Sequence, residues 1–452
     1  MEQDAWLRQS FEDEPAQDRY RFFMRPEPKE GLGPIEIEPE TGRRWRYIDL
    51  GMTRNAPEKK RMKVILDPLP HTVIEEGKPL QGWYKSKFEP EGVRARPCFT
   101  DAILTEPYGG YCTVGCAFCY INSGFRGYRG TGVITVPLNY GEHVRRQLSS
   151  MRTSAAGYFS SFTDPFLPLE DFYHNTQQGA GAFTNAGLPI FFLSRLSYPG
   201  WAYDLLRKNK YSYAQKSINT PDPEDWKHLS PGALPLGEHL DEIRALRAAG
   251  IYVSIQVNPI IPGITEHEDV EHLIQLLAES GAHHAIVKFV EAGYSWAPTM
   301  VERITKRFGG NRAAKFRDLF VDNIGGQKTI AEEYRLEGHR RYQKAATAAG
   351  ITYSTCYEYK YRRDGAGAII DKTGVSIGRE YITSEQCHGH RVPLYSRKGL
   401  DEPFTAVPEC PPTGCMYCAD DNGGKSRCGS DLFGSAKALR SADLKVAVRT
   451  PG

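Results

Sequence analysis

Three closely spaced cysteines, in the sequence Cys112-Thr-Val-Gly-Cys116-Ala-Phe-Cys119, constrain this chain more than any other feature. The spacing C-x3-C-x2-C allows three thiolates to fold around one face of a cubane iron–sulfur cluster and to ligate three of its four irons. The fourth iron then lacks a protein ligand, and an open metal position is where a substrate or cosubstrate reacts, as at catalytic zinc. The structural alternative is a zinc knuckle that lacks its fourth ligand.

The composition is that of a globular protein with ample core. The 452 residues favour roughly two or three domains, and the apolar fraction of 40% is typical of soluble proteins. The net charge of +2 provides no global attraction to nucleic acid or to an anionic membrane, and no apolar run approaches the ~20 residues of a membrane span. The acidic N-terminal sequence lacks the apolar segment of a signal peptide. We therefore expect a cytoplasmic protein whose clustered cysteines stay reduced and bind metal.

Short strand-like runs alternate with helical patterns between about residues 100 and 310. The runs cover 155–161, 188–194, 211–217, 251–257 and 285–290, and the helical patterns cover 140–151, 237–249 and 270–280. Strands that alternate with helices indicate βα units around a parallel sheet, hence an α/β fold. With a first strand that ends near Leu104, the pattern contains about six units and predicts a partial (β/α)6 barrel. Chemistry in such sheets lies at the carboxyl ends of the strands, where the cysteine loop begins.

Three regions follow from these patterns. Residues 1–100 are punctuated by Gly-Leu-Gly-Pro and Asp-Pro-Leu-Pro and predict a loop-rich N-terminal extension with short strands. Residues 101–310 predict the barrel core. Residues 311–452 begin with a basic helical stretch and predict a cysteine-rich C-terminal domain.

The cysteine motif resembles the signature of the radical SAM superfamily, in which an aromatic residue often flanks the third cysteine, as Tyr120 does here. The resemblance implies that Cys112, Cys116 and Cys119 hold a catalytic [4Fe-4S] cluster whose unique iron binds S-adenosylmethionine. It also implies a reducing donor, such as flavodoxin or ferredoxin, whose electron cleaves S-adenosylmethionine to a 5′-deoxyadenosyl radical. That radical abstracts a hydrogen atom from a substrate, while the protein positions the cofactor and excludes solvent.

A second segment, Thr163-Asp-Pro-Phe-Leu-Pro-Leu-Glu170, follows a predicted strand end. Taken alone, it fits polar contacts to S-adenosylmethionine and a Pro-terminated turn capped by Thr163 and Asp164 equally well. The string resembles the T-D-P-x-x-P-x-E segment of the spore photoproduct lyase-like branch of the superfamily. That branch also has a P-I-I-P-G turn, present here at 259–263, and the resemblance extends from about residue 107 to residue 291.

The resemblance implies cofactor-binding roles for five residues, namely Tyr120, Thr163, Asp164, Arg195 and Ser217. Arg195 stands where a lysine is usual, and arginine can pair with a carboxylate through two hydrogen bonds.

A second departure concerns the hydrogen-donor cysteine of spore photoproduct lyases proper. Its place is taken here by Phe162 with Ser161 beside it, and neither carries a weak S–H bond. We therefore do not predict thymine-dimer repair by that route.

A C-terminal group of cysteines provides a second candidate metal site. Four thiolates within a short stretch can hold a structural zinc or an auxiliary [4Fe-4S] cluster, and the alternative is incidental thiols. The auxiliary cluster is favoured over zinc because many radical SAM enzymes carry one in a C-terminal extension. The four residues are Cys410, Cys415, Cys418 and Cys428.

The leading hypothesis is a radical SAM enzyme of lyase or oxidoreductase type. Its substrate is either DNA or RNA, which the basic stretch at 306–317 would suit, or a small metabolite or peptide, which the neutral charge favours. Lys288 and Glu291 at the end of the sixth predicted strand are expected either to touch the substrate or to form an ion pair. The alternative from another class is a non-catalytic, zinc-dependent module that recognises a nucleic acid or a protein.

Overall fold

An eight-stranded sheet forms the centre of the structure, a computed structural model described here for residues 33–50, 60–74, 80–81, 102–123, 133–149, 151, 153–266, 270–294, 296–356, 358–384 and 386–407. The spatial order is β17-β13-β12-β11-β10-β9-β6-β5, and every neighbouring pair except β5–β6 is parallel. The strands are β5 (Leu80–Gln81), β6 (Ala102–Thr105), β9 (Ala156–Phe159), β10 (Ile190–Ser194), β11 (Tyr213–Ser217), β12 (Tyr252–Ile260), β13 (His284–Phe289) and β17 (Thr352–Thr355).

The predicted alternation of strands and helices is confirmed. All six predicted strands are present as β6 and β9 to β13, in chain order across the sheet. The three predicted helical patterns correspond to α4 (Tyr140–Ser149), α9 (Leu236–Ala248) and α10 (Val270–Glu279). The α/β fold with a large parallel sheet is therefore confirmed, and the sheet continues past residue 310 because β17 pairs with β13.

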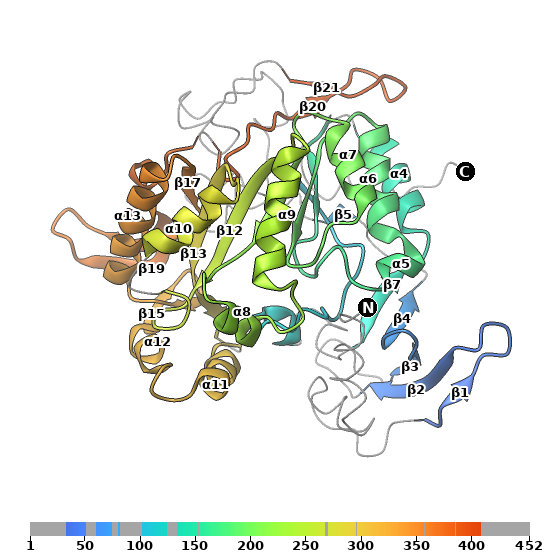
Figure 1. The fold of residues 1–452 in the computed structure, drawn as a ribbon, viewed down its shortest axis with the longest axis horizontal. Coiled ribbons are helices and arrows are strands. Elements are labelled where there is room, and N and C mark those ends of the chain that lie inside the picture. The colour runs from blue at the N-terminus through green and yellow to red at the C-terminus, as the bar shows by residue number, and fades with distance from the viewer. Residues whose placement is uncertain are drawn as a thin grey trace.

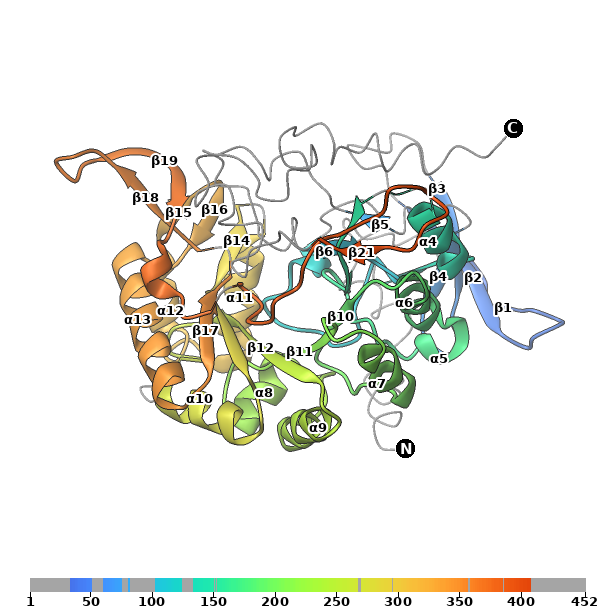
Figure 2. The same ribbon diagram turned by 90° about the horizontal axis from the view of Figure 1, so that it is seen from above.

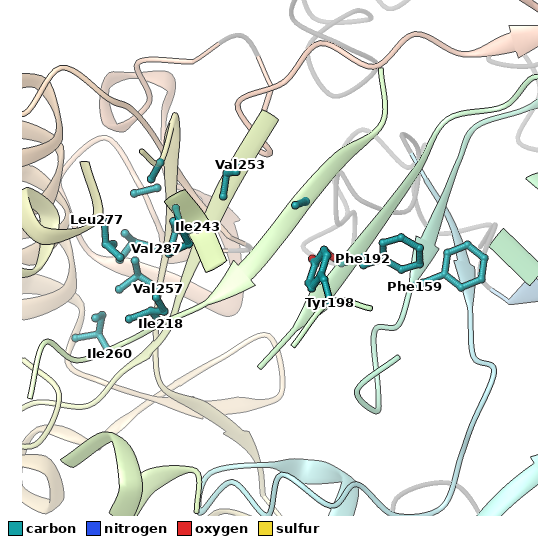
Figure 3. Packing of buried hydrophobic residues seen from close by; sticks show 14 of the residues in the cluster. Phe159, Phe192, Tyr198, Ile218, Ile243, Val253, Val257, Ile260, Leu277 and Val287 are labelled. Atoms are coloured by element: carbon teal, nitrogen blue, oxygen red, sulfur yellow. The ribbon is translucent and has the colours of Figure 1, made fainter. Parts of the chain in front are cut away.

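The helices lie along one outer side of the strands in an arc (Figure 2), which also includes α6 (Asn175–Asn185), α7 (Gly200–Arg207) and α13 (Glu332–Ala348). Alternation along each strand sends every second side chain into this layer: Val253, Ile255 and Val257 of β12 are all fully buried in the main core. Ile243 of α9 and Leu277 of α10 belong to the same layer (Figure 3). Full burial of each such aliphatic side chain contributes about 1.5–3 kcal/mol.

The opposite face of the sheet carries a ladder of stacked aromatic rings. Tyr158, Phe191 and Tyr213 occupy paired positions on three neighbouring strands, with ring centroids 4.4 Å and 4.5 Å apart. The buried ring of His388 lies 5.1 Å from that of Phe191, so the segment near residue 388 covers this face. Burial lowers the pKa of His388 to about 4, which keeps the imidazole neutral at pH 7.

Smaller elements surround this core (Figure 1). A second sheet has the order β1-β2-β3-β4-β7, and its last strand joins the N-terminal segment to the core. Its strands are β1 (Glu36–Ile37), β2 (Arg44–Leu50), β3 (Lys60–Ile65), β4 (His71–Ile74) and β7 (Ile134–Pro137). The remaining strands are β8 (Thr153–Ser154), β14 (Glu291–Gly293), β15 (Asp322–Ile324), β16 (Gln327–Thr329), β18 (Tyr359–Arg363), β19 (Ile369–Ser376), β20 (Tyr395–Ser396) and β21 (Thr405–Ala406).

Four short or peripheral helices complete the α-helices of the described residues: α5 (Glu170–Tyr173), α8 (Pro223–Leu229), α11 (Ala297–Phe308) and α12 (Ala314–Leu319). The same part of the chain contains 3-10 helices at Tyr120–Ser123 and Arg379–Tyr381. Asp222 caps α8 by accepting a hydrogen bond from the Asp225 backbone N–H at 2.8 Å, and Pro223 occupies its first turn. Within the described residues, no helix is both long enough and apolar enough to cross a membrane.

A buried ion pair joins the sheet to α9. Lys216 of β11 and Glu242 of α9 form a salt bridge with side chains that are 0% and 8% exposed. Glu242 also accepts hydrogen bonds from Ser197 Oγ at 2.8 Å and from the Tyr198 backbone N–H at 2.6 Å, and Lys216 Nζ donates to the Leu196 carbonyl at 2.7 Å. The pair therefore fixes the loop that follows β10 as well as the helix.

We predict that Glu242→Ala lowers the free energy of unfolding by about 3–5 kcal/mol, because the Lys216 ammonium would stay buried without its carboxylate. Chemical denaturation measures this change. Glu238→Ala, at an exposed position on the same helix, is the matched control and should change the free energy by no more than about 0.5 kcal/mol. Equal effects of the two substitutions would contradict the assignment.

Candidate active site

The cysteine loop begins directly after β6, at the carboxyl edge of the parallel sheet. Gly110 has φ +82°, and a Cβ there would lie 2.3 Å from the Val133 carbonyl oxygen, so only glycine fits this close approach. On its other side the loop contacts the C-terminal end of α8: the Ala117 N–H donates to the Leu229 carbonyl at 2.8 Å. Gly232 is equally constrained, since its Cβ would lie 2.2 Å from the Thr113 carbonyl oxygen.

The three thiols are withdrawn from water and lie close enough to influence one another. Cys116 is buried, and Cys112 and Cys119 are half-buried. Burial, followed by the charges of Asp164 and the neighbouring cysteines, raises the pKa of Cys112, and burial together with Cys116 raises that of Cys119 to about 12. Without metal the thiols of Cys112 and Cys119 are therefore protonated at pH 7, and metal ligation must release protons.

The donor set suits a cluster better than a single ion. Three cysteine sulfurs are a ligand set that an iron–sulfur cluster with one open iron position can use. Within the described part of the chain, no three His, Cys, Asp or Glu side chains are gathered closely enough to hold one metal ion. Ligands of a cubane bind different irons, so their sulfurs need not converge on one point.

Arg195 lies beside the thiols, as its predicted role requires. Its side chain is buried, and its guanidinium lies over the rings of Phe118 and Trp226 at 5.2 Å and 4.9 Å. Burial lowers its pKa, and the neighbouring thiols and Asp164 oppose that effect. The guanidinium donates to the Asn258 carbonyl at 3.0 Å and to Ser230 Oγ at 3.3 Å.

Asp164 fixes the loop after β9 against the end of β10. Its carboxylate accepts hydrogen bonds from the Arg195 backbone N–H at 2.8 Å, from Ser194 Oγ at 2.9 Å and from the Phe166 backbone N–H at 3.0 Å. Burial raises the pKa of Asp164, and these hydrogen bonds counteract the effect. The adjacent Thr163 hydroxyl donates to the Tyr108 carbonyl at 3.0 Å. The polar groups of this segment therefore join strand ends to the cysteine loop.

Glu106, which was not predicted from the sequence, also joins two strand ends: it follows β6 and binds the loop after β9. Its carboxylate accepts hydrogen bonds from Ser160 Oγ at 2.6 Å, from the Ser161 backbone N–H at 2.8 Å and from the Phe162 backbone N–H at 3.0 Å. Its only signal in the sequence is its place directly after a predicted strand.

Glu170, the last residue of the T-D-P-x-x-P-x-E string, has a structural role. Its carboxylate accepts the backbone N–H groups of Thr176 and Gln177 at 2.9 Å and 2.8 Å, in the first turn of α6. It also accepts the Tyr108 hydroxyl at 2.5 Å. This carboxylate therefore ties α6 to the cysteine loop.

The other residues named from the sequence lie around the same edge. Tyr120 is 40% exposed, and its hydroxyl donates to the Ser161 carbonyl at 3.1 Å. Ser217 is buried at the end of β11, paired with Gln256 of β12. Lys288 and Glu291 form an ion pair of 3.1 Å, one of the two outcomes the sequence allowed. Cys410, Cys415, Cys418 and Cys428 lie outside the described residues.

The basic stretch at 306–317 is partly used inside the protein. Arg307 donates to the carbonyls of His228 and Gly115 at 2.8 Å and 3.3 Å, which clamps the cysteine loop to the end of α8. Arg312 forms a salt bridge with Asp225 of α8. Two of its cations therefore have structural partners, which a charge pattern alone does not reveal.

Comparison with known proteins identifies the class: the chain belongs to the radical SAM enzymes. It is 62% identical over 463 residues to the radical SAM Nα-GlyT isomerase of Pseudomonas phage M6, covering 99% of this chain and 96% of that one. The predictions of a radical SAM enzyme and of its superfamily are thereby confirmed, and a non-catalytic zinc module does not fit. No family model matches the chain.

Two solved structures resemble part of the chain. Spore photoproduct lyase complexed with dinucleoside spore photoproduct matches at 15% identity with a TM-score of 0.45, covering 62% of this chain and 80% of that chain. SuiB of Streptococcus suis bound to S-adenosylmethionine matches at 10% identity with a TM-score of 0.36, covering 55% and 48%.

We predict that Glu106→Gln loosens the loop after β9, because one amide oxygen cannot replace two carboxylate oxygens and the amide N–H₂ would face other donors. The expected loss is about 1–3 kcal/mol of unfolding free energy. Hydrogen exchange at the Ser161 and Phe162 amides should accelerate in parallel. Glu271→Gln, at an exposed position on α10, is the control and should leave both measurements unchanged. Unaltered exchange in Glu106→Gln would refute the anchoring role.

Proposed function

We propose that the protein is a radical SAM isomerase that acts on Nα-GlyT or on a closely similar compound. The identity to the phage isomerase carries this proposal, because it extends over nearly the whole of both chains rather than over a cofactor motif alone. The spore photoproduct lyase-like motif identified the branch of the superfamily without indicating this reaction.

In this proposal Cys112, Cys116 and Cys119 ligate the [4Fe-4S] cluster. When bound and reduced, the cluster would supply the electron for cleavage of S-adenosylmethionine to a 5′-deoxyadenosyl radical, the species that would abstract a hydrogen atom from the substrate. The loop contacts to β7 and α8 hold the cysteine loop in place before loading. The electron comes from a reductant such as flavodoxin or ferredoxin.

The binding of S-adenosylmethionine is assigned to side chains at the carboxyl ends of successive strands. Arg195 follows β10 and has a cationic group beside the thiols, suited to a carboxylate. Thr163 and Asp164 follow β9, and Ser217 ends β11. Tyr120 follows the third cysteine. Asp164 positions Arg195 through its backbone and so contributes to the site without needing to touch the cosubstrate.

The larger organisation belongs to the same proposal. We assign residues 101–310 to a partial (β/α)6 barrel, residues 1–100 to an N-terminal extension and residues 311–452 to a C-terminal domain, with β5 from the first flank and β17 from the second added to the central sheet. Within the latter, Cys410, Cys415, Cys418 and Cys428 would bind an auxiliary [4Fe-4S] cluster or zinc. Nα-GlyT could be bound as a free compound or as part of a nucleic acid. An affinity for an oligonucleotide that falls steeply with salt concentration would indicate the nucleic acid, since phosphate contacts release counterions.

An isomerisation leaves the atoms of the substrate unchanged, so the abstracted hydrogen must be returned. Ser161 and Phe162 occupy the place of the hydrogen-donor cysteine of spore photoproduct lyases and cannot serve. We assign the return to 5′-deoxyadenosine itself: its methyl C–H bond would break as the new substrate C–H bond forms. The resulting 5′-deoxyadenosyl radical would then recombine with methionine and give one electron back to the cluster, which regenerates S-adenosylmethionine. Cys356 follows β17 at the same edge of the sheet and is the alternative donor to be tested.

The first prediction of this proposal concerns cofactor and product. Protein reconstituted with iron and sulfide should, with reductant and S-adenosylmethionine, convert Nα-GlyT to a product of identical mass and different retention. Cys116→Ala should abolish the conversion, because one cluster ligand is lost. About eight irons per chain would support an auxiliary cluster, and about four would leave the C-terminal cysteines to zinc or free thiols. A cluster-loaded protein that cleaves S-adenosylmethionine but leaves Nα-GlyT unchanged would refute the substrate assignment.

The second prediction concerns the returned hydrogen. Reactions in D₂O should give a product without solvent deuterium, and product should exceed the S-adenosylmethionine consumed, because the hydrogen stays within the pair of substrate and 5′-deoxyadenosine. Cys356→Ala should behave as the wild type. Deuterium in the wild-type product that disappears with this substitution would instead identify Cys356, whose thiol proton exchanges with solvent, as the donor.

A further inference from the structure

We infer that Ser230 and Arg195 raise the reduction potential of the cluster through Cys116. The inference rests on the proposed function, because it requires a cluster held by the three cysteines. Ser230 Oγ donates to Cys116 Sγ at 3.2 Å, and the Arg195 guanidinium donates to the same Ser230 oxygen at 3.3 Å. Since Ser230 accepts from arginine, its single hydroxyl proton is directed to the sulfur.

The two residues are enclosed and cannot exchange these bonds for water. Ser230 is 1% exposed and Arg195 is 7% exposed. The guanidinium is held between the Phe118 and Trp226 rings, and its other branch donates to the Asn258 carbonyl. The indole N–H of Trp226 in turn donates to the Leu234 carbonyl at 2.8 Å. A chain of fixed groups therefore delivers one hydrogen bond and one positive charge to Cys116.

The physical consequence is a bias toward the reduced cluster. Reduction adds negative charge, part of which resides on the cysteine sulfurs, and a hydrogen bond to sulfur stabilises that charge. A buried cation nearby acts in the same direction, and the low local dielectric strengthens its effect. An enzyme that must accept an electron from a flavodoxin or ferredoxin benefits from both.

The hydrogen bond from Ser230 to the Cys116 sulfur is not needed to hold the cysteine loop in place. The backbone of the cysteine loop is held separately, by the Ala117 N–H on the Leu229 carbonyl and by Arg307 on Gly115. Loss of the Ser230 hydroxyl would therefore remove the bond to sulfur while the loop stays anchored.

The test is a redox titration of the reconstituted full-length protein, followed by the electron paramagnetic resonance signal of the reduced cluster. Ser230→Ala should shift the potential to more negative values, with a roughly threefold to tenfold lower ratio of reduced to oxidised cluster at a fixed solution potential. Arg195→Lys keeps the charge but loses the guanidinium fork, so its shift should have the same direction and be smaller. Ser197→Ala is the matched control, because the Ser197 hydroxyl donates to Glu242 and to no cysteine.

The iron content of each protein distinguishes a failure of the proposed function from a failure of the inference about Ser230 and Arg195. Wild-type protein that binds no cluster would overturn the proposed function. A cluster-loaded Ser230→Ala protein with wild-type potential would overturn only the present inference. If Ser230→Ala fails to take up iron, Arg195→Lys decides: a negative shift supports the inference, and an unchanged potential refutes it.

Discussion

Hydrogen bonds accepted by two buried carboxylates hold the candidate active site together. Glu106 follows β6 and binds the loop after β9, while Asp164 in that loop binds the end of β10. Three successive strand ends are thereby joined at the edge where the cysteine loop begins. Burying Asp164 is costly, as the upward shift of its pKa shows, and three hydrogen bonds to one carboxylate offset that cost. These bonds act together with a small apolar cluster in the same loops, in which Tyr108, Tyr111, Leu167 and Leu169 are buried.

The features that the sequence predicted correctly are local ones. The alternation of apolar residues with turns predicted six strands and three helices, since each pattern is complete within about ten residues. The cysteine spacing was likewise readable in a single loop. Its resemblance to radical SAM enzymes was confirmed at the level of the whole chain by a relative of 62% identity. Strands, helices and the cysteine loop could be predicted because neighbouring residues determine each of them.

The residues that the sequence did not reveal act over long distances along the chain. Ser230 bonds to a cysteine 114 residues away, and Glu106 reaches Ser161 across 55 residues. Neither residue stands in a motif, because what matters is the fold that brings the partners together. Glu170 shows the reverse case: it belongs to a recognisable string, and in this structure it caps α6 and binds Tyr108. Motif membership thus indicates a location more securely than it indicates a role.

The connection from β11 to α9 runs from Ser217, a residue proposed to bind the cosubstrate, to the cysteine loop. It starts at Ser217, assigned to S-adenosylmethionine, and reaches the cysteine loop at Ser230 and Gly232. Between these points Asn219 donates to the Pro259 carbonyl, and Arg312 pairs with Asp225 of α8. These contacts make the segment rigid, so a displacement of Ser217 would be passed along it to Ser230, which donates a hydrogen bond to Cys116. Arg195 contacts the same segment and lies beside the sulfurs, so a carboxylate bound there would alter the charge that the cluster experiences. If Ser217 and Arg195 bind the cosubstrate as proposed, its binding and the readiness of the cluster for reduction would be coupled through this short stretch of chain.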